Sequence, residues 1–162
     1  MSASNDSTAN YLNGLFYYLS KNQVVLKTLQ KNVREVINKE EDITYSKIRA
    51  LDYLEWCLNE NLRIYGPGTS VMLREANTNF YVDNVPIMKG TGLKIEQLAN
   101  HYNPSFYKDP FKFDPSRWNN HDIDPYLLGG FGYGAHACLG KSLAILLTKI
   151  TTVLMLIRFD KI

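Results

Sequence analysis

The chain has 162 residues, about the length of one domain and enough to bury a single sizeable core. Hydrophobic residues make up 45% and charged residues 21%, which excludes collagen-like, low-complexity and disordered proteins. Eighteen basic and 16 acidic side chains leave a net charge of +2, so no basic footprint for nucleic acid or an anionic membrane is present. Two distant cysteines, Cys57 and Cys138, exclude a disulfide scaffold and a Cys-rich zinc module.

Apolar residues recur at helical spacing through the first part of the chain. Residues 1–20 start polar and turn apolar, and a second amphipathic helix follows Asn22, which can cap it. The charged stretch 39–42 predicts a solvated turn. A third helix is predicted from Tyr45 to Tyr65, ended by the Gly-Pro pair at 66–67. The apolar stripes of these helices indicate core-facing surfaces.

Short β-rich runs follow from Thr69 to Ile95. Residues 79–82 and 85–88 flank Asp83-Asn84, which predicts a hairpin. Pro86 makes its second arm an edge strand or a bulge, because proline cannot donate to a sheet.

The last third predicts a long coil and then an apolar helix. Residues 100–137 have little periodicity, and an ordered irregular stretch of that length is usually functional. The helix from Cys138 to Arg158 carries Lys149 near its middle, so we interpret it as a buried core helix rather than a membrane span. The predicted fold class is therefore mainly α with a small β region, in one domain over residues 1–162.

The segment from Gly129 to Ser142, GGFGYGAHACLGKS, is the strongest candidate for a functional site. Gly140-Lys141-Ser142 matches the end of a P-loop, but that motif needs glycine where Ala135 stands. A dinucleotide fingerprint fits only loosely, because no βαβ unit can follow it. His136 and Cys138 as a nucleophile pair are a further alternative, although neighbours two apart at a helix entrance seldom face each other.

A metal ligand and a buried structural cysteine are the remaining interpretations of Cys138. A helix N-terminus stabilises a thiolate through its dipole and its free N–H groups. One cysteine cannot build a zinc or iron–sulfur site alone, but it can supply the single protein ligand of a haem iron. The density of glycine around Cys138 favours the metal ligand.

Residues 131–140, FGYGAHACLG, resemble the haem-binding signature of the cytochrome P450 family, F-x-x-G-x-[R/H]-x-C-x-G, at every fixed position. Glu60-Asn61-Leu62-Arg63 resembles the ExxR motif of the family's K helix, and residues 113–118, FDPSRW, resemble its PERF-type motif. Residues 89–91, KGT, resemble the turn between them. These motifs stand in the family's order, from within the I helix to just after the L helix, which implies a partial cytochrome P450 fold (α+β).

The resemblance implies a role for each matched residue. Cys138 would be the thiolate ligand of haem b, beside the shielding Phe131. The other residues that would contact the porphyrin or its propionates are Arg74, Gly134, His136 and Gly140. The residues that would hold the architecture behind the haem as a network are Glu60, Arg63 and Arg117.

Residues 3–8, ASNDST, resemble the oxygen-activating pattern A-G-x-[D/E]-T-[T/S] of the I helix. Ser4 replaces its glycine and Ser7 its first threonine. The resemblance implies that Asp6 and Ser7, with Thr8 as a second hydroxyl, deliver protons during catalysis. A cluster of helix N-cap residues is an equally good interpretation of this segment.

The function implied is haem-thiolate monooxygenation of a small, apolar organic substrate, with electrons from a reductase. Two alternatives remain open: an inactive remnant without a closed haem site, and a P450-like enzyme that rearranges peroxides. We expect the membrane anchor of such a protein, and most of its substrate pocket, to lie outside these residues. The sequence does not indicate the cellular location, although the endoplasmic reticulum is common in the family.

Overall fold

The structure is a computed structural model that describes residues 2–67, 72–119 and 123–159. Its α-helices are α1 (Ser2–Lys21), α2 (Gln23–Val36), α3 (Tyr45–Arg49), α4 (Asp52–Tyr65), α5 (Gln97–His101) and α6 (Lys141–Arg158). Short 3-10 turns are η1 (Glu40–Asp42), η2 (Pro115–Asn119), η3 (Pro125–Leu127) and η4 (Gly134–His136). The strands are β1 (Met72–Glu75), β2 (Phe80–Val82), β3 (Val85–Ile87) and β4 (Gly92–Ile95). The prediction of a mainly helical fold with small antiparallel sheets is confirmed.

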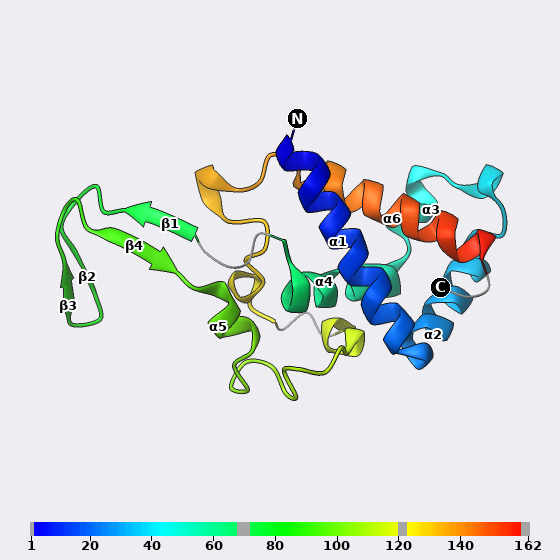
Figure 1. The fold of residues 1–162 in the computed structure, drawn as a ribbon, viewed down its shortest axis with the longest axis horizontal. Helices are drawn as coiled ribbons and strands as arrows, with labels where there is room; N and C mark the ends of the chain where they lie inside the picture. The colour runs from blue at the N-terminus through cyan, green and yellow to red at the C-terminus, as the bar shows by residue number, and fades with distance from the viewer. Residues whose placement is uncertain (1, 68–71, 120–122, 160–162) are drawn as a thin grey trace.

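The core lies between α1, α2, α4 and α6, which pack against one another (Figure 1). The apolar stripes predicted from the sequence meet there, because each of these helices buries one face. The fully or nearly fully buried core residues include Leu15, Leu19, Leu26, Leu29, Val33, Leu54, Leu58, Val153 and Leu156. Burial of these side chains is the main favourable contribution to folding.

The prediction of one helix from Tyr45 to Tyr65 is wrong, because the chain turns at Ala50 and Leu51 between α3 and α4. The Ala50 N–H donates to the carbonyls of Ser46 and Lys47, which closes α3. Leu51 leaves the helical region with ψ of 75°, and its side chain is 3% exposed. Ile48 on α3 and Leu51 at the turn both lie in the hydrophobic core, and their burial stabilises this arrangement.

One predicted helix cap and one predicted helix start differ from the structure. Asn22 precedes α2, but its side chain makes no cap and donates instead to the Tyr18 carbonyl at 2.7 Å. The last helix begins at Lys141 rather than at Cys138. The Cys138 N–H is already paired with the Phe131 carbonyl at 2.7 Å, so residue 138 belongs to the preceding loop.

Lys149 is buried on α6, the helix predicted to belong to the core, with its side chain 6% exposed and its Nζ 2.9 Å from the Glu55 carboxylate. The ion pair joins α6 to α4 and supplies the partner that a buried ammonium needs. In the part of the chain that the structure describes, no helix is long and apolar enough to cross a bilayer.

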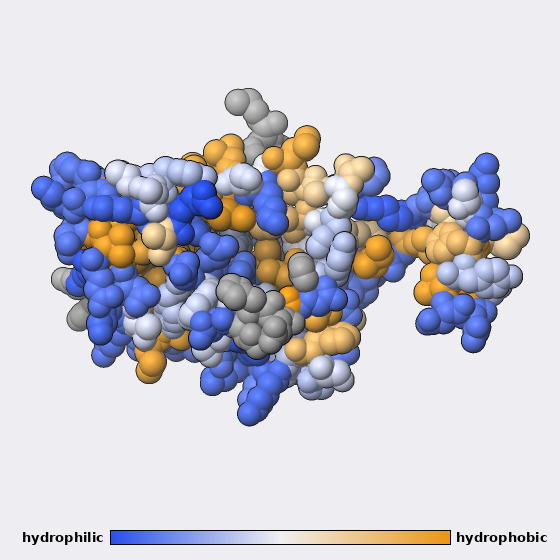
Figure 2. Space-filling model, turned by 180° about the vertical axis from the view of Figure 1, so that it is seen from behind, coloured by the Kyte–Doolittle hydropathy of each residue, from blue (hydrophilic) through white to orange (hydrophobic). Residues whose placement is uncertain are grey.

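The strands form an arm that stands off from the helical body (Figures 1 and 2). β1 and β4 are antiparallel, with Met72 opposite Ile95, and β2 and β3 form the predicted hairpin. Asp83, at the turn, has φ of 50°, and Pro86 lies opposite Tyr81 in the two-stranded sheet. Thr69, where the β-rich region was predicted to begin, lies outside the described residues.

Candidate functional site

Glu60 and Arg63 lie in the second half of α4, and neither side chain is exposed to solvent. Their spacing of three residues places them on one face of the helix. Arg63 donates from Nε to one Glu60 oxygen at 2.9 Å and from Nη2 to the other at 2.8 Å. The sequence motif is therefore a buried bidentate ion pair, the strong form of this interaction.

Arg117 and Trp118 reach the same carboxylate from η2, more than 50 residues further along the chain. Arg117 Nε donates to Glu60 Oε1 at 3.0 Å, and Trp118 Nε1 donates to Oε2 at 2.9 Å. The Asp114 N–H adds a hydrogen bond to Oε1 at 2.9 Å. The structure thus brings together Glu60, Arg63 and Arg117, the three residues singled out from the sequence.

The coil between α5 and η2 is tied down by the two arginines. Arg63 Nη1 donates to the carbonyls of His101 and Pro110 at 2.6 and 2.8 Å, and Arg117 Nη1 to that of Lys108 at 3.1 Å. The Tyr107 ring lies 4.9 Å from the guanidinium carbon of Arg63 and 6.0 Å from that of Arg117. Burial raises the pKa of Tyr107 to about 12, so it stays a neutral phenol between two cations.

Trp118 and Tyr107 are members of this network that sequence reasoning missed. Trp118 belongs to the FDPSRW segment, and an indole N–H beside a motif arginine was the available signal. Tyr107 had no comparable signal, because it is one of 11 tyrosines.

The loop that precedes α6, which we call the Cys138 loop, comprises residues 129–140. It is closed by hydrogen bonds from the Gly132 N–H to the Gly129 carbonyl at 2.8 Å and from the Cys138 N–H to the Phe131 carbonyl at 2.7 Å. Gly132 and Gly134 have φ of 68° and 63°, a region that side chains other than glycine rarely adopt. The glycines thus permit the tight path that returns Cys138 to Phe131.

Cys138 lies exposed just before the N-terminus of the 18-residue α6. The next residue, Leu139, is fully exposed, and Leu143 and Leu147 follow at intervals of four with exposures of 61% and 46%. A thiol donor beside a row of uncovered leucines fits a ligand that combines a metal with a large apolar plane, which is the chemistry of a haem. The residues present therefore fit the cofactor that the sequence resemblance implies.

Phe131, within the Cys138 loop, contacts α1. Phe131 is partly buried, and its ring lies edge-on to that of Tyr11 with the centroids 6.4 Å apart. Tyr11 is one helical turn from Ser7 and Thr8, so the three residues share a face of α1. Asp6 and Ser7 are exposed and Thr8 is partly buried. The start of α1 therefore lies on the side of the molecule that carries the Cys138 loop (Figure 1).

Arg74 and His136, the two basic residues expected near the propionates, lie on different elements. His136 is exposed in η4, within the Cys138 loop, as are Gly134 and Gly140. Arg74 lies on β1, on the same face as Met72, since the two are separated by two residues in a strand. A Cβ at Gly132 would lie 3.8 Å from the Met72 sulfur, so this face of β1 starts beside the loop.

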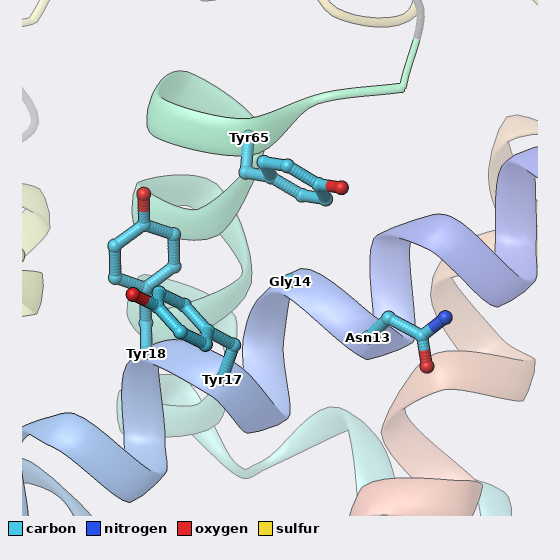
Figure 3. A pocket seen from close by; sticks show the side chains of 5 residues that line it. All are labelled: Asn13, Gly14, Tyr17, Tyr18 and Tyr65. Atoms are coloured by element: carbon cyan, nitrogen blue, oxygen red, sulfur yellow. The ribbon is translucent and has the colours of Figure 1, made fainter.

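A separate cleft of about 350 Å³ lies between α1 and the end of α4 (Figure 3). Tyr17, Tyr18 and Tyr65 line it with Asn13 and Gly14. A Cβ at Gly14 would overlap the Tyr65 ring, so glycine lets that ring lie close to the surface of α1. No residue of the Cys138 loop lines this cleft, so it is distinct from the candidate site.

These features define a helical protein with a thiol held at a helix entrance and a buried Glu–Arg–Arg network that joins α4 to η2. The family model for cytochrome P450 matches residues 1–161. Cytochrome P450 3A14 of Cavia porcellus is 29% identical over 158 residues, covering 96% of this chain and 31% of the relative. Cytochrome P450 71B14 of Arabidopsis thaliana is 33% identical over 159 residues, covering 96% and 32%.

Cytochrome P450 monooxygenase poxM of Penicillium oxalicum is 31% identical over 163 residues, covering 98% of this chain and 32% of the relative. The chain belongs to the cytochrome P450 family. It spans about a third of the length of these curated relatives.

Proposed function

We propose that this chain forms the cysteine-bearing part of a haem-thiolate monooxygenase, in which Cys138 would supply the protein ligand of the iron. The family supports this class of activity in general. The observation that carries the proposal for this chain is the Cys138 loop, which holds an exposed thiol beside uncovered leucines at the start of α6. When bound, the haem supplies the oxidation chemistry that places one atom of dioxygen in an organic substrate and releases the other as water.

The proximal residues hold the ligand and its surroundings. Cys138, just before the N-terminus of α6, would supply the sulfur that binds the haem iron. Phe131, within the loop, contacts Tyr11 and would shield the sulfur once the haem is bound, as the resemblance implies. Arg74 and His136 would pair with the propionate carboxylates of the cofactor. Gly134 and Gly140 have no side chains, so they would let the porphyrin approach the backbone of the loop closely.

Two further groups act at a distance from the thiol. Glu60, Arg63 and Arg117 fix the coil behind the loop, so their role is architectural and not chemical. Asp6, Ser7 and Thr8 lie at the start of α1 and would hold and pass the protons that the reaction consumes. A reductase partner supplies electrons, and the substrate is a small organic molecule, as in the family generally.

The test is made in a chimaera that joins the N-terminal two-thirds of a relative to this chain. We expect a thiolate-type Soret band in the reduced carbon monoxide complex, which Cys138→Ala abolishes because the sulfur ligand is lost. Cys57→Ala is the matched control and should leave the band intact, since Cys57 is buried inside α4. Survival of the band in Cys138→Ala would show that the ligand is assigned wrongly.

The exposure of Cys138, Leu139 and Leu143 favours a second candidate, a remnant that does not retain haem by itself. We expect the 162-residue chain to bind haem weakly, because these residues give one uncovered face and not an enclosed cavity. Haem titration of the purified chain, with the reduced carbon monoxide spectrum, measures this. Stoichiometric binding with a stable thiolate spectrum would contradict it and favour an independent haem pocket.

A further inference from the structure

Two adjacent glycines at the beginning of the Cys138 loop lie directly against side chains from other elements. A Cβ at Gly129 would overlap the side-chain amide of Gln97, which belongs to α5. A Cβ at Gly130 would lie 2.6 Å from Cγ and Cδ1 of Leu62, which belongs to α4. The base of the loop therefore contacts one side chain from α5 and one from α4. Both side chains fit there because the glycines have no Cβ.

Gln97 is an unusual residue for such a position. It is 5% exposed, and its Oε1 has no hydrogen-bond partner among the described residues. Its Nε2 lies 3.9 Å from the Met72 sulfur, a weak contact. A buried amide with an unpaired oxygen costs free energy, so hydrogen bonding does not explain the residue. What the side chain does provide is a flat surface that covers the backbone of Gly129.

Two backbone hydrogen bonds within the loop connect Gly129 to Cys138, the candidate ligand. The Gly129 carbonyl accepts from Gly132, and the Phe131 carbonyl accepts from Cys138. At the other end of α5, the His101 carbonyl accepts from Arg63 at 2.6 Å. The five-residue helix thus connects the buried Glu60 network to the base of the Cys138 loop.

We propose that Gln97 is a positioning residue, whose side chain holds the base of the Cys138 loop through its contact with Gly129 and so sets the place of the thiol. The relevance of this role to catalysis rests on the proposed function. The contact between Gln97 and Gly129 is a feature of the fold and does not depend on that function. Shape, and not the amide group, is the property that matters. Methionine at position 97 retains that shape and removes the unpaired oxygen, and alanine leaves a gap.

Amide hydrogen exchange of the full chain without haem tests the proposal, with the Cys138 N–H as reporter and core amides of α4 as reference. Gln97→Ala should lower the protection of the Cys138 amide by about tenfold more than that of the α4 amides, the size of effect expected of a packing defect. Gln97→Met should retain it. Gly92→Ala is the matched control, since nothing lies within 4 Å of a Cβ there.

The decisive variant is the pair Gly129→Ala and Gln97→Ala. Gly129→Ala alone should lower the Cys138 protection by about tenfold through overpacking, and the double variant should recover most of it because the new methyl group fills the vacated space. Additive losses in the double variant, or equal losses at Cys138 and in α4, would overturn the proposal. The readout needs no haem, so failure of the haem assignment in the Cys138→Ala spectrum is a separate result.

Discussion

The Glu60 network and the Cys138 loop are the two parts of the candidate site, and they are built in opposite ways. The network is buried, and both oxygens of the Glu60 carboxylate accept hydrogen bonds from the protein. The loop is exposed from Gly134 through Leu143, and its thiol faces solvent. The Glu60 carboxylate thus finds its hydrogen-bond donors within this chain, whereas the loop leaves the thiol and Leu139 exposed. Stability and function are therefore expected to depend on different residues.

The largest expected difference between the exposed loop and the buried part of α4 is the reactivity of their cysteines. Cys138 should react with a disulfide reagent in the native chain at least about a thousandfold faster than Cys57, which must wait for the core to open. Burial also raises the pKa of the Cys57 thiol and keeps it protonated. Counting labelled thiols in native buffer and in urea measures this: one native thiol and two unfolded thiols are expected. Rapid native labelling of Cys57 would show that α4 is not held in the core.

Removal of the Glu60 carboxylate tests the network. Glu60→Ala leaves the buried Arg63 without its counter-charge and should lower the free energy of unfolding by about 3–5 kcal/mol. Urea unfolding of the chain measures this change.

Lys31→Ala is the control, since its pairing with Glu35 on α2 spans 3.9 Å with both side chains largely exposed, and its cost should stay below about 0.5 kcal/mol. A loss for Glu60→Ala as small as that of the control would mean that the network does not stabilise the fold.

His101 should make a smaller contribution to the free energy of unfolding, and this contribution depends on pH. Its ring is fully buried, and burial lowers its pKa from the ordinary value of 6.5. The positive charge of Arg63 acts in the same direction, whereas the backbone of Arg63 and Leu127 and the charge of Glu60 oppose it. The folded chain then binds fewer protons than the unfolded chain, so this contribution is complete above pH 6.5 and is lost as the pH falls toward the lowered pKa.

Unfolding measured between about pH 5 and 7, where few carboxylates titrate, should show stability rising with pH. His101→Phe should flatten that dependence. An unchanged slope in the variant would show that His101 does not titrate differently in the folded chain.

Much of the local structure follows from residues close together in the chain. Apolar stripes predicted α1, α2 and most of α6, and the Asp83-Asn84 turn predicted the hairpin, because periodicity and turn chemistry act within a few residues. The merged helix at 45–65 was wrong because nothing local marks Ala50 as a turn. The start of α6 was placed too early because the Cys138 N–H pairs with Phe131, seven residues back.

The family-like motifs and their order can be recognised from the amino-acid sequence, since they depend only on residue identity and spacing. The surroundings of these motifs depend on the fold. Trp118 and the Asp114 N–H reach Glu60 across 58 and 54 residues of chain. The contact of Gln97 with Gly129 likewise joins segments 32 positions apart (129 − 97). Such pairings depend on how α4, α5 and the coil pack in three dimensions, and no periodic pattern along the chain encodes that packing.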